Sequence, residues 1–146
     1  MGIKIEELMR KNVVYLTPAQ PLEHIKKIFE KNKISALPVI DSDEHVIGII
    51  SHKDLIKFTN PELRASDMMT QNVYTIPEYE KVEVAARIMR NHKIHHLVVT
   101  KDKKLMGIIS SFDLLKLVEN HRYVAKNNSA ARNPTGKRNK AEMASA

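Results

Sequence analysis

Two copies of one sequence pattern make up most of this chain, and this repeat constrains the fold more than any other feature. Residues 9–40 align without a gap with residues 69–100. The clearest match is GIISHKDLIK (48–57) against GIISSFDLLK (107–116), in which seven of ten positions are identical. A unit of about 50 residues buries too little surface to be stable alone. We therefore expect the copies to pack together around a shared core, related by a pseudo-twofold axis.

Each copy predicts the same order of elements, β-α-β-β-α. A short apolar run opens each copy, at residues 13–16 and 73–76, and indicates a strand. An amphipathic helix follows, then two strands rich in branched residues, then a helix that begins at the serine of GIIS. Ahead of the first copy, Ile5, Leu8 and Met9 predict a short N-terminal helix that packs on the core. The expected fold class is α/β, of the mixed α+β kind.

Charge divides the chain into three expected regions. Residues 1–60 hold the N-terminal helix and first repeat, 61–119 the second repeat, and 120–146 a basic tail. Of the net charge of +7, the tail supplies most, with six Lys/Arg and one acid, against 18 Lys/Arg and 16 acids in residues 1–119. The tail is poor in large apolar side chains, which predicts a flexible extension. Weak, nonspecific nucleic-acid binding through the tail is an alternative function, although nucleic acid is not the expected partner.

Composition excludes several kinds of chemistry. The chain has no cysteine, which removes disulfides, thiolate metal sites and a cysteine nucleophile, and fits a reducing cytoplasm. Its apolar runs are too short to span a membrane, and no catalytic motif such as HExxH, a P-loop or GxGxxG is present. We therefore expect a cytoplasmic protein that is not an enzyme. Gly48 and Gly107 stand alone inside predicted strands, which indicates a close approach of another segment.

The two copies resemble the CBS domain, named after cystathionine beta-synthase, in its tandem-pair form. In the first copy LTPAQPLEHIKKIFEKNKISALPVID and GIISHKD carry the resemblance, and in the second TIPEYEKVEVAARIMRNHKIHHLVV and GIISSFD carry it. It covers roughly residues 5–118. The resemblance implies a regulatory module that binds AMP, ADP, ATP or S-adenosylmethionine in clefts between the copies. It also implies a homodimer that acts on an unknown partner protein and requires no cofactor.

The Ser-x-x-Asp segments, Ser51 with Asp54 and Ser110 with Asp113, are the leading candidates for ligand contact. A carboxylate accepts strong hydrogen bonds from the two hydroxyls of a ribose. A serine at a helix N-terminus lies beside free amide groups that favour a phosphate. The same spacing is that of a capping box, worth about 1 kcal/mol without any ligand. Both interpretations stay open, and they are compatible.

Other candidates flank these segments. Leu37, Pro38 and Val39 are expected to supply apolar walls and backbone groups for an adenine ring, and Lys53 is expected to face a phosphate. The second copy departs from the first in two ways, with Val98 in place of Pro38 and Phe112 in place of Lys53. Lys33 and Lys93 stand where the resembled family often has glycine.

His95 and His96 are the remaining candidates. They lie on the strand expected to line the second cleft, and alternation along a strand sends them to opposite faces. One histidine would then contact a phosphate in a pH-dependent way, or both would be packed or solvated. Zinc is not expected, because adjacent histidines diverge and no third ligand is evident. If these histidines or Lys53 filled both clefts, the protein would instead be a ligand-free scaffold.

Overall fold

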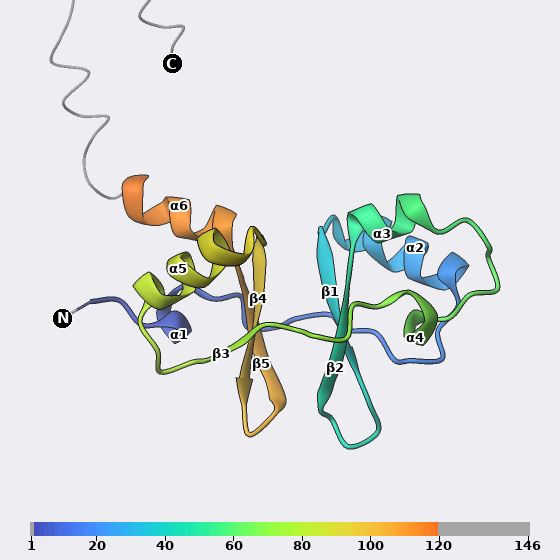
Figure 1. The fold of residues 1–146 in the computed structure, drawn as a ribbon, viewed down its shortest axis with the longest axis horizontal. Helices are drawn as coiled ribbons and strands as arrows, with labels where there is room; N and C mark the ends of the chain where they lie inside the picture. The colour runs from blue at the N-terminus through green and yellow to red at the C-terminus, as the bar shows by residue number, and fades with distance from the viewer. Residues whose placement is uncertain (1, 120–146) are drawn as a thin grey trace, which may run out of the picture. The chain divides into compact units, whose positions relative to one another are not determined.

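Both copies fold into matching elements in the computed structural model, which describes residues 2–119 (Figure 1). The first copy contains α2 (Leu22–Asn32), β1 (Ala36–Ile40), β2 (Val46–Ser51) and α3 (His52–Lys57). The second contains β3 (Thr75–Pro77), α5 (Val82–His92), β4 (His96–Lys101), β5 (Lys104–Ser110) and α6 (Ser111–Glu119). Short helices α1 (Ile5–Leu8) and α4 (Ala65–Met68) precede the copies. The predicted mixed α/β fold class is confirmed.

By its internal contacts the chain divides into two compact units, residues 1–113 and 114–146. Both copies lie in the first unit as far as the start of α6, and so do the clefts described below. The predicted basic tail, residues 120–146, lies outside the described residues.

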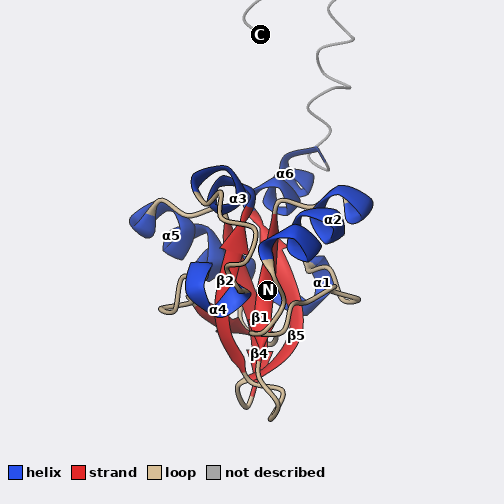
Figure 2. Cartoon of the chain, turned by 90° about the vertical axis from the view of Figure 1, so that its right-hand side faces the viewer, coloured by secondary structure: helices blue, strands red, loops and turns tan. Residues whose placement is uncertain are grey.

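The two long helices form for the reason that their sequences predict. Apolar residues recur every three or four positions, so one face of each helix is buried. On α2 the buried residues are Leu22, Ile25 and Phe29, and on α5 they are Val82, Ala85 and Met89. Viewed from the side, α2 and α5 flank the strands (Figure 2). Each helix ends at a lysine in the left-handed conformation, Lys33 with φ 50° and Lys93 with φ 56°.

The strand expected at residues 13–16 is not formed. Leu16 alone makes a bridge, parallel to Val39, with its N–H donating to Pro38 O at 2.8 Å. Leu16 is fully buried, whereas Val14 and Tyr15 are exposed. Of residues 13–16 only Leu16 pairs with β1 and enters the core, so the segment makes a single bridge and not a strand. The matching segment of the second copy does form β3, which pairs in parallel with β4 but begins only at Thr75.

In both copies the central hairpin has the same register. β1 and β2 pair antiparallel with Ala36 opposite Ser51, and β4 and β5 pair antiparallel with His96 opposite Ser110. Each hairpin has an irregularity at the equivalent place, after Val39 and after Val99. This register puts the serine of each Ser-x-x-Asp segment beside the first residue of the neighbouring strand.

The segment that leads into each copy completes the sheet of the other copy. Arg10 bridges Ile108 on β5, and Thr70 bridges Ile49 on β2, both in antiparallel fashion. The N-terminal helix α1 packs on α5 of the second copy, and α4 packs on β2 of the first. The predicted N-terminal helix therefore exists, and it belongs to the core of the second repeat.

Two strand glycines, Gly48 on β2 and Gly107 on β5, leave room for the segments that pair with these strands. A Cβ on Gly107 would lie 2.6 Å from Arg10 O, and a Cβ on Gly48 would lie 2.3 Å from the sulfur of Met69. The close approach predicted from the two isolated glycines is confirmed. Glycine is required at these positions because another segment occupies the space of a side chain.

Candidate ligand-binding clefts

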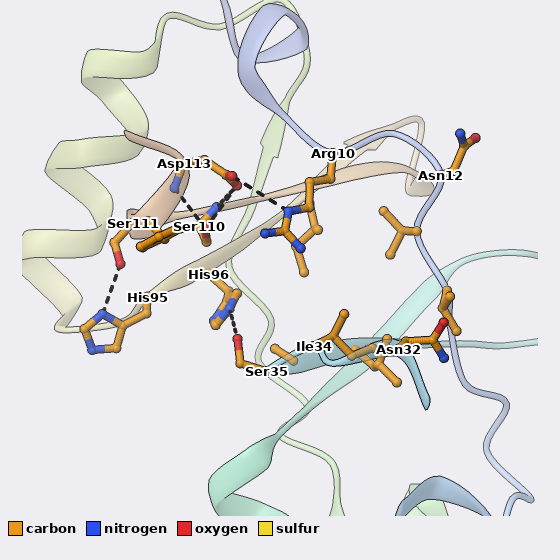
Figure 3. Close-up of a pocket in the computed structure, with 16 residues that line it drawn as sticks. Arg10, Asn12, Asn32, Ile34, Ser35, His95, His96, Ser110, Ser111 and Asp113 are labelled. Carbon is orange, nitrogen blue, oxygen red and sulfur yellow. Dashed lines mark hydrogen bonds and ion pairs between the residues drawn. The ribbon is translucent and has the colours of Figure 1, made fainter. Parts of the chain in front are cut away.

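Two clefts lie between the copies, and each takes wall residues from both copies. The Asp113 cleft, about 580 Å³ in volume, contains Ser110 and Asp113 (Figure 3). The Asp54 cleft, about 420 Å³, contains Ser51, Lys53 and Asp54. Both volumes fall within the range of about 300–1,000 Å³ that is typical of small-molecule sites.

In the Asp113 cleft the aspartate is buried in the first turn of α6 and caps that helix, which follows β5 directly. Its Oδ2 accepts hydrogen bonds from Ser110 N at 2.9 Å and from Ser110 Oγ at 3.0 Å, and its own N–H donates to Ser110 Oγ at 3.1 Å. The capping interpretation of this segment is therefore confirmed. The side chain of Asp113 is 1% exposed, yet the residue belongs to the cleft wall.

Arg10 approaches the same carboxylate from the segment ahead of the first copy. Its Nε lies 3.8 Å from Asp113 Oδ1, and its side chain is 58% exposed (Figure 3). The backbone of Arg10 is fixed to β5 by two hydrogen bonds with Ile108, at 2.9 and 3.0 Å. Reasoning from the sequence missed this residue, because Arg10 is about one hundred positions from Asp113. The available signal was Gly107, which indicated that some segment lies against β5.

In the Asp54 cleft the same cap occurs with a different neighbour. Oδ2 of Asp54 accepts from Ser51 N at 2.8 Å and from Ser51 Oγ at 3.2 Å. Thr70, at the position that corresponds to Arg10, lines this cleft. Within residues 2–119 no cation pairs with the Asp54 carboxylate, so the two aspartates are alike in their caps and differ in their charge partners.

His95 and His96 line both clefts, together with Ser35 and Ala36. The Nε2 of His96 lies 3.0 Å from Ser35 Oγ, a hydrogen bond between the copies, and the Nδ1 of His95 lies 3.3 Å from Ser111 Oγ (Figure 3). Burial lowers the pKa of His96 from its ordinary 6.5, and the charges of His95 and Arg10 lower it further, although Asp113 opposes them. The neutral imidazole is thus favoured at this shared wall.

The structure brings together most of the predicted site residues. Lys53 lines the Asp54 cleft and Leu37 lines the Asp113 cleft. Pro38 and Val39 lie buried in β1 and line neither cleft, because the parallel contact with Leu16 covers that part of the strand. His95, His96 and Lys53 leave both clefts open, so they do not fill them as a ligand-free scaffold would require.

Several wall residues were not predicted from the sequence. Asn12 and Asn72 are equivalent in the two copies and line the Asp113 and Asp54 clefts, respectively. Tyr74 and Lys93 line the Asp54 cleft, and the Tyr74 ring is stacked on His92 with centroids 4.2 Å apart. The repeat alignment paired Asn12 with Asn72, which is the signal that could have found them.

Comparison with known proteins agrees with the repeat and the fold. The family model of the CBS domain matches twice, at residues 5–60 and 65–120. The chain belongs to the CBS-domain family. Inosine-5'-monophosphate dehydrogenase of Staphylococcus aureus is 32% identical over 111 residues, which is 74% of this chain and 23% of that enzyme. The chain thus spans about a quarter of the length of the curated relatives it matches.

Solved structures give the same assignment. The CBS domain pair of protein MJ0100, in complex with 5'-methylthioadenosine and S-adenosylmethionine, has a TM-score of 0.77 and 25% identity over 82% of this chain and 98% of that one. CBSX2 in complex with AMP has a TM-score of 0.74 and 21% identity, with coverage of 82% and 98%, which shows the fold alone. Across residues 2–119, no helix is long and apolar enough to cross a membrane.

Proposed function

We propose that this tandem CBS pair is a regulatory module that binds an adenosine compound, AMP, ADP, ATP or S-adenosylmethionine, in its clefts and passes the change to a partner protein. The observation that carries the proposal is the pair of open clefts, each with a Ser-x-x-Asp segment in its wall. The MJ0100 domain pair, bound to two adenosine compounds, supports the ligand class.

The chemistry of the walls fits such a ligand. In both clefts the aspartate caps the helix that follows through Oδ2, and a carboxylate in the cleft wall is a strong acceptor of hydrogen bonds from ribose hydroxyls. Asn12 and Asn72 add amide groups that both donate and accept, as recognition of a base edge requires. Ile34 and Ile94, at equivalent positions, supply apolar surface for the purine.

Regulation follows from the location of the clefts. Because each cleft has walls from both copies, a ligand that contacts both walls favours one packing of the copies over another. We propose that a partner protein senses this packing, and that the module itself carries out no catalysis. We place it in the cytoplasm, as a cysteine-free composition suggests.

We also propose that two chains pair, since Ile56 on α3 and Phe112 on α6 are 72% and 70% exposed. We propose that these two side chains belong to one contiguous apolar patch, the kind of surface that favours an interface between proteins.

Calorimetric titration with AMP, ADP, ATP and S-adenosylmethionine tests the proposal. Wild-type protein should bind at least one of them, and Asp54→Ala with Asp113→Ala should remove that binding. Asp67→Ala is the matched control, because Asp67 Oδ2 caps α4 through Arg64 N at 2.9 Å and lines neither cleft. The Asp→Asn pair keeps the shape of the caps if the alanine variant does not fold. Sedimentation velocity on the same samples measures whether the chain is a dimer.

Absence of heat with all four ligands would contradict the proposal, as would equal binding by the double variant and the Asp67→Ala control. A monomer at micromolar concentration would contradict the pairing of chains and leave ligand binding as a separate result.

A further inference from the structure

We infer that the two clefts differ in ligand selectivity, and that Lys53 and Lys93 make the Asp54 cleft the one that selects for a phosphate on the adenosine compound. This rests on the proposed function, since it concerns the same clefts. The repeat makes the comparison internal to the molecule, because each wall residue of one cleft has a counterpart from the other copy.

The cations of the two clefts differ in number and in pairing. Lys53 comes from α3 of the first copy and Lys93 from the end of α5 of the second, and both line the Asp54 cleft. Both are exposed, and within residues 2–119 neither forms an ion pair. Their charges are therefore available to a phosphate. Among the described residues that line the other cleft, the one arginine or lysine is Arg10, and its charge is compensated by the buried carboxylate of Asp113.

The residues at the counterpart positions account for this difference in charge between the two clefts. Phe112 replaces Lys53 in the Asp113 cleft, where its ring is 70% exposed. Lys33, the counterpart of Lys93, is not among the residues that line that cleft. An exposed aromatic ring and an arginine already paired with a carboxylate attract a phosphate less strongly than two ammonium groups that form no ion pair.

The Asp54 cleft also carries a surface suited to the base. Tyr74 lines it and is 44% exposed, whereas the Asp113 cleft has Val14 at the equivalent place. His92 stacks on Tyr74 at 4.2 Å with an interplanar angle of 28°, which restrains the ring. Aromatic rings stack well on purines. The same cleft thus combines a base platform, a carboxylate for the ribose and two cations for a phosphate.

The experiment compares adenosine with AMP, which differ only by the phosphate, by calorimetric titration of the full chain. We expect wild-type protein to prefer AMP at one class of site. Lys53→Met with Lys93→Met should weaken AMP binding by about tenfold, the effect of two charge-assisted contacts, and leave adenosine binding unchanged. Asp54→Ala should remove the AMP-preferring class, and Asp113→Ala should retain it.

The matched control is Lys33→Met with Lys57→Met. It removes the same number of charges from the counterpart of Lys93 and from α3, at residues that line neither cleft. An unchanged ratio of AMP to adenosine affinity in Lys53→Met with Lys93→Met would overturn the inference and leave the proposed function standing. So would loss of that ratio in Arg10→Met. Absence of binding by either compound, together with ADP, ATP and S-adenosylmethionine, would overturn the proposed function itself.

Discussion

Alanine substitution of the two equivalent strand glycines should have unequal effects, although both added methyl groups would be crowded. At Gly107 the new Cβ would lie 2.6 Å from the carbonyl oxygen of Arg10 and 2.7 Å from the sulfur of Met9. At Gly48 all three nearest atoms belong to the side chain of Met69, at 2.3, 2.7 and 2.9 Å. A side chain can change rotamer, whereas a bridged backbone carbonyl cannot move without breaking its bridge.

The expected magnitudes follow from what must move. Overpacking alone costs about 1–3 kcal/mol. Displacing Arg10 from β5 also breaks its two hydrogen bonds with Ile108, at 2.9 and 3.0 Å, each worth about 1 kcal/mol net. We therefore expect Gly107→Ala to lower the free energy of unfolding by about 3–5 kcal/mol. Gly48→Ala should lower it by about 1–2 kcal/mol, since Met69 can rearrange.

Urea denaturation of two double-mutant cycles measures this difference. Met69→Ala should recover part of the loss caused by Gly48→Ala, because it removes the two nearest clashing atoms. Met9→Ala should not recover the loss caused by Gly107→Ala, because Arg10 O remains in place. If Met9→Ala rescues Gly107→Ala, or if Gly107→Ala is no more destabilising than Gly48→Ala, the assignment of Arg10 as a structural edge of β5 is refuted.

Two further predictions concern the shared wall and the end of α2. The lowered pKa of His96 means that the unfolded chain binds its proton more readily than the folded one, so stability should fall as the pH drops below about 6.5 and level off below the folded pKa. His96→Gln should flatten this decline in urea midpoints measured between about pH 5 and pH 8, and His24→Gln, on the exposed side of α2, should not. Lys33→Gly should raise the free energy of unfolding by about 1 kcal/mol, because φ 50° is unfavourable for a residue with a Cβ. Lys31→Gly, inside the same helix, should lower it by about 1 kcal/mol, and a loss of stability in Lys33→Gly would contradict the argument.

Local patterns predicted most of the regular structure. The amphipathic helices, the hairpins and the caps at Ser51 and Ser110 all depend on residues a few positions apart, which is the range over which spacing carries information. The strand expected at residues 13–16 was wrong because its apolar residues do not share one environment. Leu16 enters the core, while Val14 lines a cleft.

The candidate site was predicted in part for the same reason. Ser51 with Asp54 and Ser110 with Asp113 are local pairs, and their repetition pointed to two related clefts. Arg10 and Lys93 were missed because each lines the cleft whose Ser-x-x-Asp segment lies in the other half of the sequence. Pro38 and Val39, expected to line a cleft, line neither, since the sequence does not show that Leu16 covers β1.

The sequence by itself determined the family, the order of elements and the two Ser-x-x-Asp segments, because a repeat compared with itself reveals positions that serve the same role twice. Only the tertiary structure decided that the segment leading into each copy completes the sheet of the other. That exchange brings Arg10 to Asp113 and Thr70 to the Asp54 cleft. The physical reason is that pairing at a sheet edge depends on backbone hydrogen bonds and on the space that a glycine leaves. Backbone groups are the same in every residue and a glycine has no side chain, so the sequence does not show which distant segment will pair there. Two nearly equivalent copies thereby acquire clefts of different charge.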